Sequence, residues 1–315
     1  KVERFVNMTK KLGDNILFWY SLLVSIVIFS FRSFAGPGLV WKDDFIPRHR
    51  IYSYYSLFVW NPLEHGGTLN DDLSNAVLNS IKAFLSSIFG LELVSKVYVV
   101  GVVALCGVLM FKALVGFRDL FNHSRNYMVC FIGALVFTVN PWVTSRILSG
   151  HFFILSSYAF TPLFLYYLVQ YFDADNGKYR FIKCSFLFSL VSMTSNHGFI
   201  MSLFLSFIVT LWYFVVFRKG VVILRASFVF IISLLINSFW IFPTINMIFN
   251  GIRDISFIQD ISTALSINAN WVNTIRLLGY FWSPYDKGIY MAGDLFQKVW
   301  FGLSFLSPVL VLISV

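Results

Sequence analysis

Long apolar stretches recur along this chain and limit what it can fold into. A helix needs about 20 residues to cross the roughly 30 Å of hydrocarbon in a bilayer. Only 12% of the residues are charged and 58% are hydrophobic, whereas about a quarter of a soluble domain is charged. The sequence therefore predicts an all-α, polytopic transmembrane helix bundle of about eight spans, at 15–34, 97–116, 128–143, 152–172, 181–194, 199–217, 221–242 and 297–315.

We expect one transmembrane domain over residues 1–315. The last apolar run stops at Val315, which predicts that the chain is the N-terminal part of a longer polypeptide. The first run is too long for the apolar core of a signal peptide and lacks a small-residue cleavage site, so it is predicted to be a span. Polar residues from Ser192 to Gly198 interrupt the apolar segment 181–217, which predicts two helices joined by a turn.

Alternating crossings sort the charged residues between two sides. The short segments 1–14, 117–127, 173–183 and 218–220 fall on one side and are rich in lysine and arginine. Cytoplasmic loops retain positive charge, so this side and the N-terminus are predicted to be cytoplasmic in a multi-pass protein of the cell membrane. The external side receives most of the carboxylates.

Two long external loops, 35–96 and 243–296, are expected to carry structure of their own. From Leu73 to Phe89, apolar residues recur at helical spacing with polar residues between them, which predicts an amphipathic interfacial helix. A second pattern of this kind, from Trp271 to Trp282, is rich in the aromatics that favour the headgroup zone. Long loops in compact domains are usually functional or disordered.

A pair of aspartates follows the first span closely. Asp43 and Asp44 would stand near the membrane surface, where partial desolvation and neighbouring arginines suit a carboxylate for general-base catalysis. Arg48 and Arg50 are candidate substrate-binding residues. A solvated acidic turn, balanced by these arginines and Lys42, would give the same pattern.

A second pair, Asp71 and Asp72, directly precedes the predicted amphipathic helix. These carboxylates would bind substrate, or would only cap the helix and favour its positive end. A divalent metal held by both pairs with His49 or His65 is a further hypothesis. The spacing fixes no ligand set, so no cofactor is predicted with certainty.

The segment between the third and fourth spans places Arg146 and His151 at the same external boundary. Arginine presents a planar fork of donors that suits phosphate, so Arg146 is a candidate for a lipid phosphate or pyrophosphate. Extension towards lipid headgroups from a helix end is its simpler role. His151 and His197 are candidate proton carriers or ligands, although interfacial histidines are more often only hydrogen-bonded.

Several function classes are disfavoured. The spans contain almost no ionisable residues, which argues against ion-driven transport, and no P-loop or dinucleotide fingerprint occurs. The net charge of +9 comes from residues that flank apolar spans, so it does not indicate a nucleic-acid partner. Cys106, Cys130 and Cys184 fall inside apolar runs and are predicted to be small core hydrophobes.

A first span, a carboxylate-bearing external loop with an amphipathic helix, and many further spans resemble the C-type superfamily of integral-membrane glycosyltransferases. The segment from Asn140 to His151, followed by Tyr158-Ala-Phe-Thr-Pro162-Leu, is similar to a segment of the arabinofuranosyltransferase-like branch. The resemblance implies a sugar donor carried on a polyprenyl phosphate and an external acceptor, which could be a glycan, a lipid or a protein. It also implies an acidic residue early in the first external loop that serves as base or positions the acceptor, here Asp43 or Asp44.

In this hypothesis an aspartate takes the acceptor proton, while Arg146, with Arg48 or Arg50, stabilises the departing lipid phosphate. Two alternatives stay open. A non-catalytic membrane subunit would use its external loops to dock a surface or complex partner. A lipid or glycan flippase would use helix breaks at Pro141, 195–197 and Pro243 as gates, and predicts an internal repeat that the sequence does not show.

Overall fold

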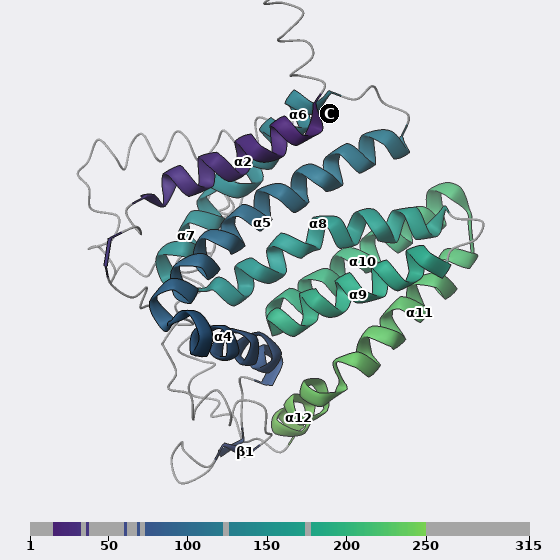
Figure 1. Cartoon of the computed structure of the whole chain (residues 1–315). Coiled ribbons are helices and arrows are strands. Elements are labelled where there is room, and N and C mark those ends of the chain that lie inside the picture. The colour runs from purple at the N-terminus through teal and green to yellow at the C-terminus, as the bar shows by residue number, and fades with distance from the viewer. Residues whose placement is uncertain are drawn as a thin grey trace, which may run out of the picture.

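The computed structural model describes residues 15–32, 36–37, 60–61, 68–69, 73–121, 126–173 and 178–249. These residues form helices, apart from one short antiparallel ladder in which Trp60 lies opposite Leu69 (Figure 1). In chain order the elements are α2 (Ile16–Ser30), β1 (Trp60–Asn61), β2 (Thr68–Leu69), η3 (Leu73–Asn75), α4 (Ala76–Phe89), α5 (Leu91–Leu120), α6 (Tyr127–Val139), α7 (Pro141–Ser149), α8 (Phe152–Phe172), α9 (Lys178–Thr194), α10 (Asn196–Phe217), α11 (Val221–Ile236) and α12 (Ser238–Phe249).

The long helices lie side by side in a bundle, and the chain reverses direction from α8 through α11 (Figure 1). We call the end where α5, α8 and α10 finish the basic end, because Arg118, Lys178, Arg180, Arg218 and Lys219 lie there. At this end Lys219 Nζ lies 2.8 Å from Asp173 Oδ1. The opposite end, which we call the α4 end, holds α4, α7 and α12.

Three described helices, α5, α8 and α10, are long and apolar enough to cross a membrane, and α11 with α12 would form a fourth, bent span. These helices indicate a multi-pass membrane protein. The predicted eight spans are too many for the described residues. With 15 and 13 residues, α2 and α6 extend only about 22 and 20 Å. The first turns of α9 carry the basic residues Lys178, Arg180 and Lys183, so the apolar part of this helix is short. The last predicted span, 297–315, lies outside the described residues.

Polar residues set the helix boundaries. The predicted span 152–172 coincides with α8, but the predicted span 128–143 is divided at Asn140 into α6 and α7. The predicted turn between the fifth and sixth spans shrinks to Ser195, whose Oγ accepts from the N–H of Gly198 at 3.3 Å. The predicted span 221–242 bends by 80° at Asn237. This buried amide donates to Ser233 O at 2.8 Å and accepts from Trp240 Nε1 at 3.0 Å.

The predicted helix within Leu73–Phe89 is confirmed as η3 and α4. Leu73 and Ala76 are buried, whereas the apolar stripe of α4 is exposed, including Val77, Ile81, Phe84 and Ile88. Such a stripe suits contact with lipid at the membrane boundary. The second predicted amphipathic segment lies outside the described residues.

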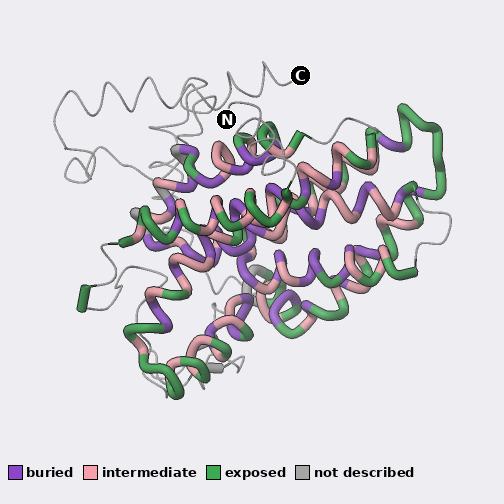
Figure 2. The backbone as a smooth tube through the Cα atoms, turned by 45° about the horizontal axis from the view of Figure 1, so that its top comes forward, coloured by how far each residue is buried: buried purple, intermediate pink, exposed green. Residues whose placement is uncertain are grey.

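Apolar side chains, several of them aromatic, fill the interior where α8, α9, α10 and α11 meet. Exposed positions lie towards the periphery of the bundle (Figure 2). The rings of Phe164 and Phe188 stack with centroids 4.8 Å apart. Gly198 of α10 packs directly against the Ser157 side chain of α8, and small residues of this kind let membrane helices approach closely. Cys106, Cys130 and Cys184 are buried and free, as predicted.

Candidate functional site

The segment that carries the family resemblance folds as a short helix between two longer ones. Asn140 ends α6 and caps α7, since its Oδ1 accepts from the N–H of Val143 at 3.0 Å. Pro141 occupies the first position of α7, where its missing N–H costs nothing. The Asn140 amide also donates to Phe137 O at 2.7 Å and contacts the Tyr158 hydroxyl at 3.0 Å. One side chain therefore joins α6, α7 and α8.

Aromatic rings surround this amide. Tyr158 stacks on Phe137 with centroids 4.0 Å apart and lies 4.8 Å from the Trp142 ring. Its hydroxyl donates to Phe137 O at 3.2 Å. Because the Asn140 amide and the Tyr158 hydroxyl are both hydrogen-bonded, the junction has a defined geometry on which a site can be built.

A glycine in the left-handed backbone conformation ends α7. Gly150 has φ +80°, a conformation that favours glycine. Its N–H donates to Ile147 O at 3.2 Å, and the N–H of His151 donates to Arg146 O at 3.0 Å. This pattern is a Schellman motif, which satisfies the last carbonyls of the helix. The turn folds His151 back towards Arg146.

The structure brings the two sequence-predicted residues at this junction into contact. Nη1 of Arg146 lies 2.9 Å from Nδ1 of His151. Arginine can only donate, so Nδ1 accepts and the histidine proton resides on Nε2. Arg146 is only 7% exposed, and its guanidinium lies 5.3 Å from the centre of the Trp142 ring. The pair combines a buried cation with a neutral N–H donor, which together suit a phosphate group.

A further cation stands at the same end of the bundle. Lys82 of α4 lies over the rings of Phe153, at 4.2 Å, and Tyr98, at 5.0 Å. The Tyr98 hydroxyl pairs with Ser156 Oγ at 3.1 Å. Sequence reasoning missed Lys82, although a lysine inside the apolar pattern of α4 was a visible signal. Its contacts fix α4 against α5 and α8.

His197 belongs to a different junction at the α4 end. It lies exposed in the first turn of α10, between the cap Ser195 and Gly198. The remaining candidates, Asp43, Asp44, Arg48, Arg50, Asp71 and Asp72, lie outside the described residues and stay predictions. Among the residues that the structure describes, no group of three His, Cys, Asp or Glu side chains could hold a metal ion.

Comparisons with protein-family models, with curated protein sequences and with solved structures find no match for this chain.

Proposed function

We propose that this chain is a membrane glycosyltransferase that moves a sugar from a polyprenyl-phosphate donor to an acceptor on the external face. The observation that carries the proposal is the contact between Arg146 and His151 at one end of an apolar helix bundle. A polyprenyl chain dissolves in the bilayer, so an enzyme that uses it needs its phosphate-binding groups at the membrane boundary.

The two residues suit the departure of a lipid phosphate. In the transfer, an acceptor oxygen bonds to the anomeric carbon of the sugar and the bond from that carbon to the phosphate oxygen breaks. The phosphate leaves with the bonding electron pair, and the acceptor proton goes to Asp43 or Asp44. The Arg146 guanidinium and the Nε2–H of His151 would stabilise the developing phosphate charge, because both are already fixed in place.

Apolar surface for the lipid chain is present at the same end. The exposed stripe of α4 includes Ile81, Phe84 and Ile88. The apolar cluster that contains Val143, Phe152 and Leu155 is buried and supports the Arg146–His151 pair from the interior. A prenyl chain against the α4 stripe would lie at the same end of the bundle as the guanidinium.

The proposed orientation puts the basic end in the cytoplasm and the α4 end outside. Lysine and arginine gather where α5, α8 and α10 end, and cytoplasmic loops retain such residues. The shorter helices α2, α6 and α9 pack beside the long ones and complete the bundle. Donor and acceptor would then meet on the external side.

Release of polyprenyl phosphate from labelled polyprenyl-phosphate sugars tests the function. The full chain would be reconstituted in liposomes with membrane extract as the acceptor source, and compared with Arg146→Lys, Asp43→Asn and Asp44→Asn. We expect release by the wild type, at least a tenfold loss in Arg146→Lys, and no transfer in the variant that lacks the base. Lys178→Gln, an exposed charge change at the basic end, is the matched control.

Retained transfer in both aspartate variants would exclude these residues as the base. Absence of release by the folded wild type would favour the non-catalytic subunit instead.

A further inference from the structure

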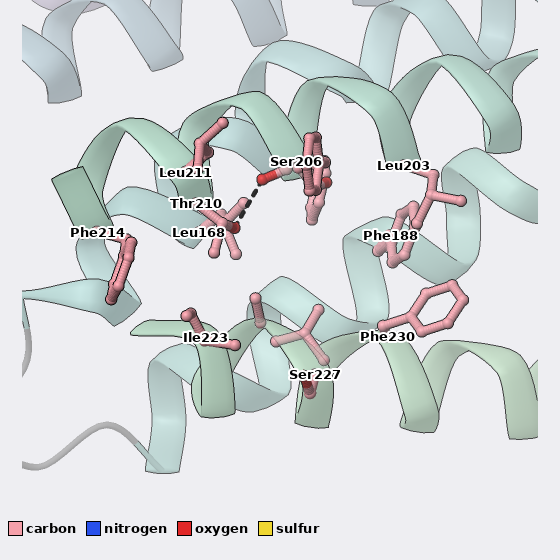
Figure 3. Close-up of a pocket in the computed structure, with 14 residues that line it drawn as sticks. Leu168, Phe188, Leu203, Ser206, Thr210, Leu211, Phe214, Ile223, Ser227 and Phe230 are labelled. Carbon is pink, nitrogen blue, oxygen red and sulfur yellow. Dashed lines mark hydrogen bonds between the residues drawn. The ribbon is translucent and has the colours of Figure 1, made fainter. Parts of the chain in front are cut away.

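A groove of about 290 Å³ lies between α10 and α11, far in the fold from the Arg146–His151 pair (Figure 3). Leu203 and Phe230 line one end of it, and Phe214 and Ile223 line the other. Phe188 of α9 contributes to its inner wall. The outward faces of both helices are rich in exposed apolar residues, so in a bilayer this groove would open to lipid.

Two of the hydroxyls that line the groove, those of Ser206 and Thr210, are bonded within α10. Ser206 Oγ donates to Ser202 O at 2.5 Å, and Thr210 Oγ1 donates to Ser206 O at 2.7 Å, as the dashed line in Figure 3 marks. Hydroxyls bonded to the preceding turn do not require water. The walls therefore offer an apolar surface that suits a hydrocarbon chain.

One end of the groove is next to a basic turn. Phe214 precedes Arg218 by four residues, which is about 6 Å along a helix. Arg218 is exposed and ends α10 in the left-handed conformation, with φ 52°. Its neighbour Lys219 pairs with Asp173. Within this turn, Arg218 is thus placed to meet a negative group at the membrane surface.

We infer that the groove holds one acyl chain of an anionic glycerophospholipid, whose phosphate lies at Arg218. The apolar walls match a single hydrocarbon chain, and the cation at the Phe214 end matches the charge of the headgroup. A second copy of this chain would explain the apolar faces but not the basic group at the mouth. This site lies at the opposite end from the proposed donor site and does not depend on the proposed function.

Binding of two lipids, phosphatidylglycerol and phosphatidylcholine, is compared to test the site. Native mass spectrometry of the purified full chain would count retained lipids after exposure to either one. We expect the wild type to retain phosphatidylglycerol about fivefold better, since one basic residue near an anionic surface contributes about that much. Arg218→Gln should remove the preference, whereas Lys178→Gln should keep it.

Filling the groove separates the acyl-chain contact from charge. Ser227 is exposed and lines the groove, so Ser227→Phe should prevent retention of both lipids. Leu224→Phe is the matched control, because Leu224 lies on the same helix, is 57% exposed and does not line the groove. Size-exclusion and thermal unfolding confirm that each variant is folded, and Ser227→Leu is the second filling variant.

Equal retention of the two lipids by the wild type would overturn the inference. So would unchanged retention in both filling variants. A dimer that Ser227→Phe dissociates would assign the groove to a second copy of the chain and would likewise overturn it.

Discussion

Arg146 and His151 lie on opposite sides of the turn that joins α7 to α8, with Nη1 of the arginine 2.9 Å from Nδ1 of the histidine. Five positions separate them in the sequence, and the left-handed Gly150 between them closes the distance. In this contact Nδ1 of the histidine is the acceptor, so the histidine proton is on Nε2. The site therefore depends as much on the turn as on the two side chains.

Gly150→Ala should destabilise the folded chain by about 1–2 kcal/mol, because a Cβ is disfavoured in the left-handed conformation. Thermal unfolding in one detergent measures the change. Gly101→Ala is the control, since Gly101 lies inside α5 with open space around its Cα, where alanine should stabilise the helix by roughly 0.5–1 kcal/mol. An equal unfolding temperature for the two variants would contradict the role given to this turn.

Asn140→Ala should destabilise the chain by about 2 kcal/mol, because it removes both the cap of α7 and the bonds to Phe137 and Tyr158. Asn126→Ala is the matched control. Asn126 caps α6 in an exposed setting, through one bond from the N–H of Val129 at 3.2 Å, so its loss should cost about 1 kcal/mol. Chemical denaturation of both variants checks the difference, and the reverse order would refute this account of the junction.

Single cysteines at the two ends of the bundle test the orientation. In intact cells a membrane-impermeant maleimide should modify Ser87→Cys on α4 and leave Lys178→Cys unmodified, whereas permeabilised cells should show both. The native Cys106, Cys130 and Cys184 are at most 2% exposed, so they add little background. Modification of Lys178→Cys alone in intact cells would invert the orientation.

Hydropathy predicted α8 to the residue, because a run of apolar side chains is bounded there by His151 and Asp173. Hydropathy did not predict the helix boundary where an apolar run continues through a polar capping residue. The predicted span 128–143 passed through Asn140, although asparagine followed by proline is a helix-start signal. The bend at Asn237 has no proline at that position, and only the packed structure shows the buried amide that is bonded there.

The candidate site was predictable in part. Parity of the crossings predicted that Arg146, His151 and His197 share one side of the membrane, which stays a prediction. In the structure, α7 and the first turns of α8 and α10, which carry these residues, lie at the α4 end (Figure 1). It could not reveal that Arg146 contacts His151 while His197 lies at a different junction, because contact depends on the backbone angles of Gly150. The predicted aspartates lie outside the described residues, and their relation to the arginine remains a prediction.

Affinity of the purified full chain for polyprenyl phosphate tests the central claim most directly. Arg146→Lys keeps the charge but loses the planar fork and its geometry towards His151. We predict that the affinity falls about tenfold or more, the loss expected for one charged hydrogen bond, while Lys178→Gln binds as the wild type does. Equal affinity of folded Arg146→Lys and wild type would contradict a lipid-phosphate site at this junction.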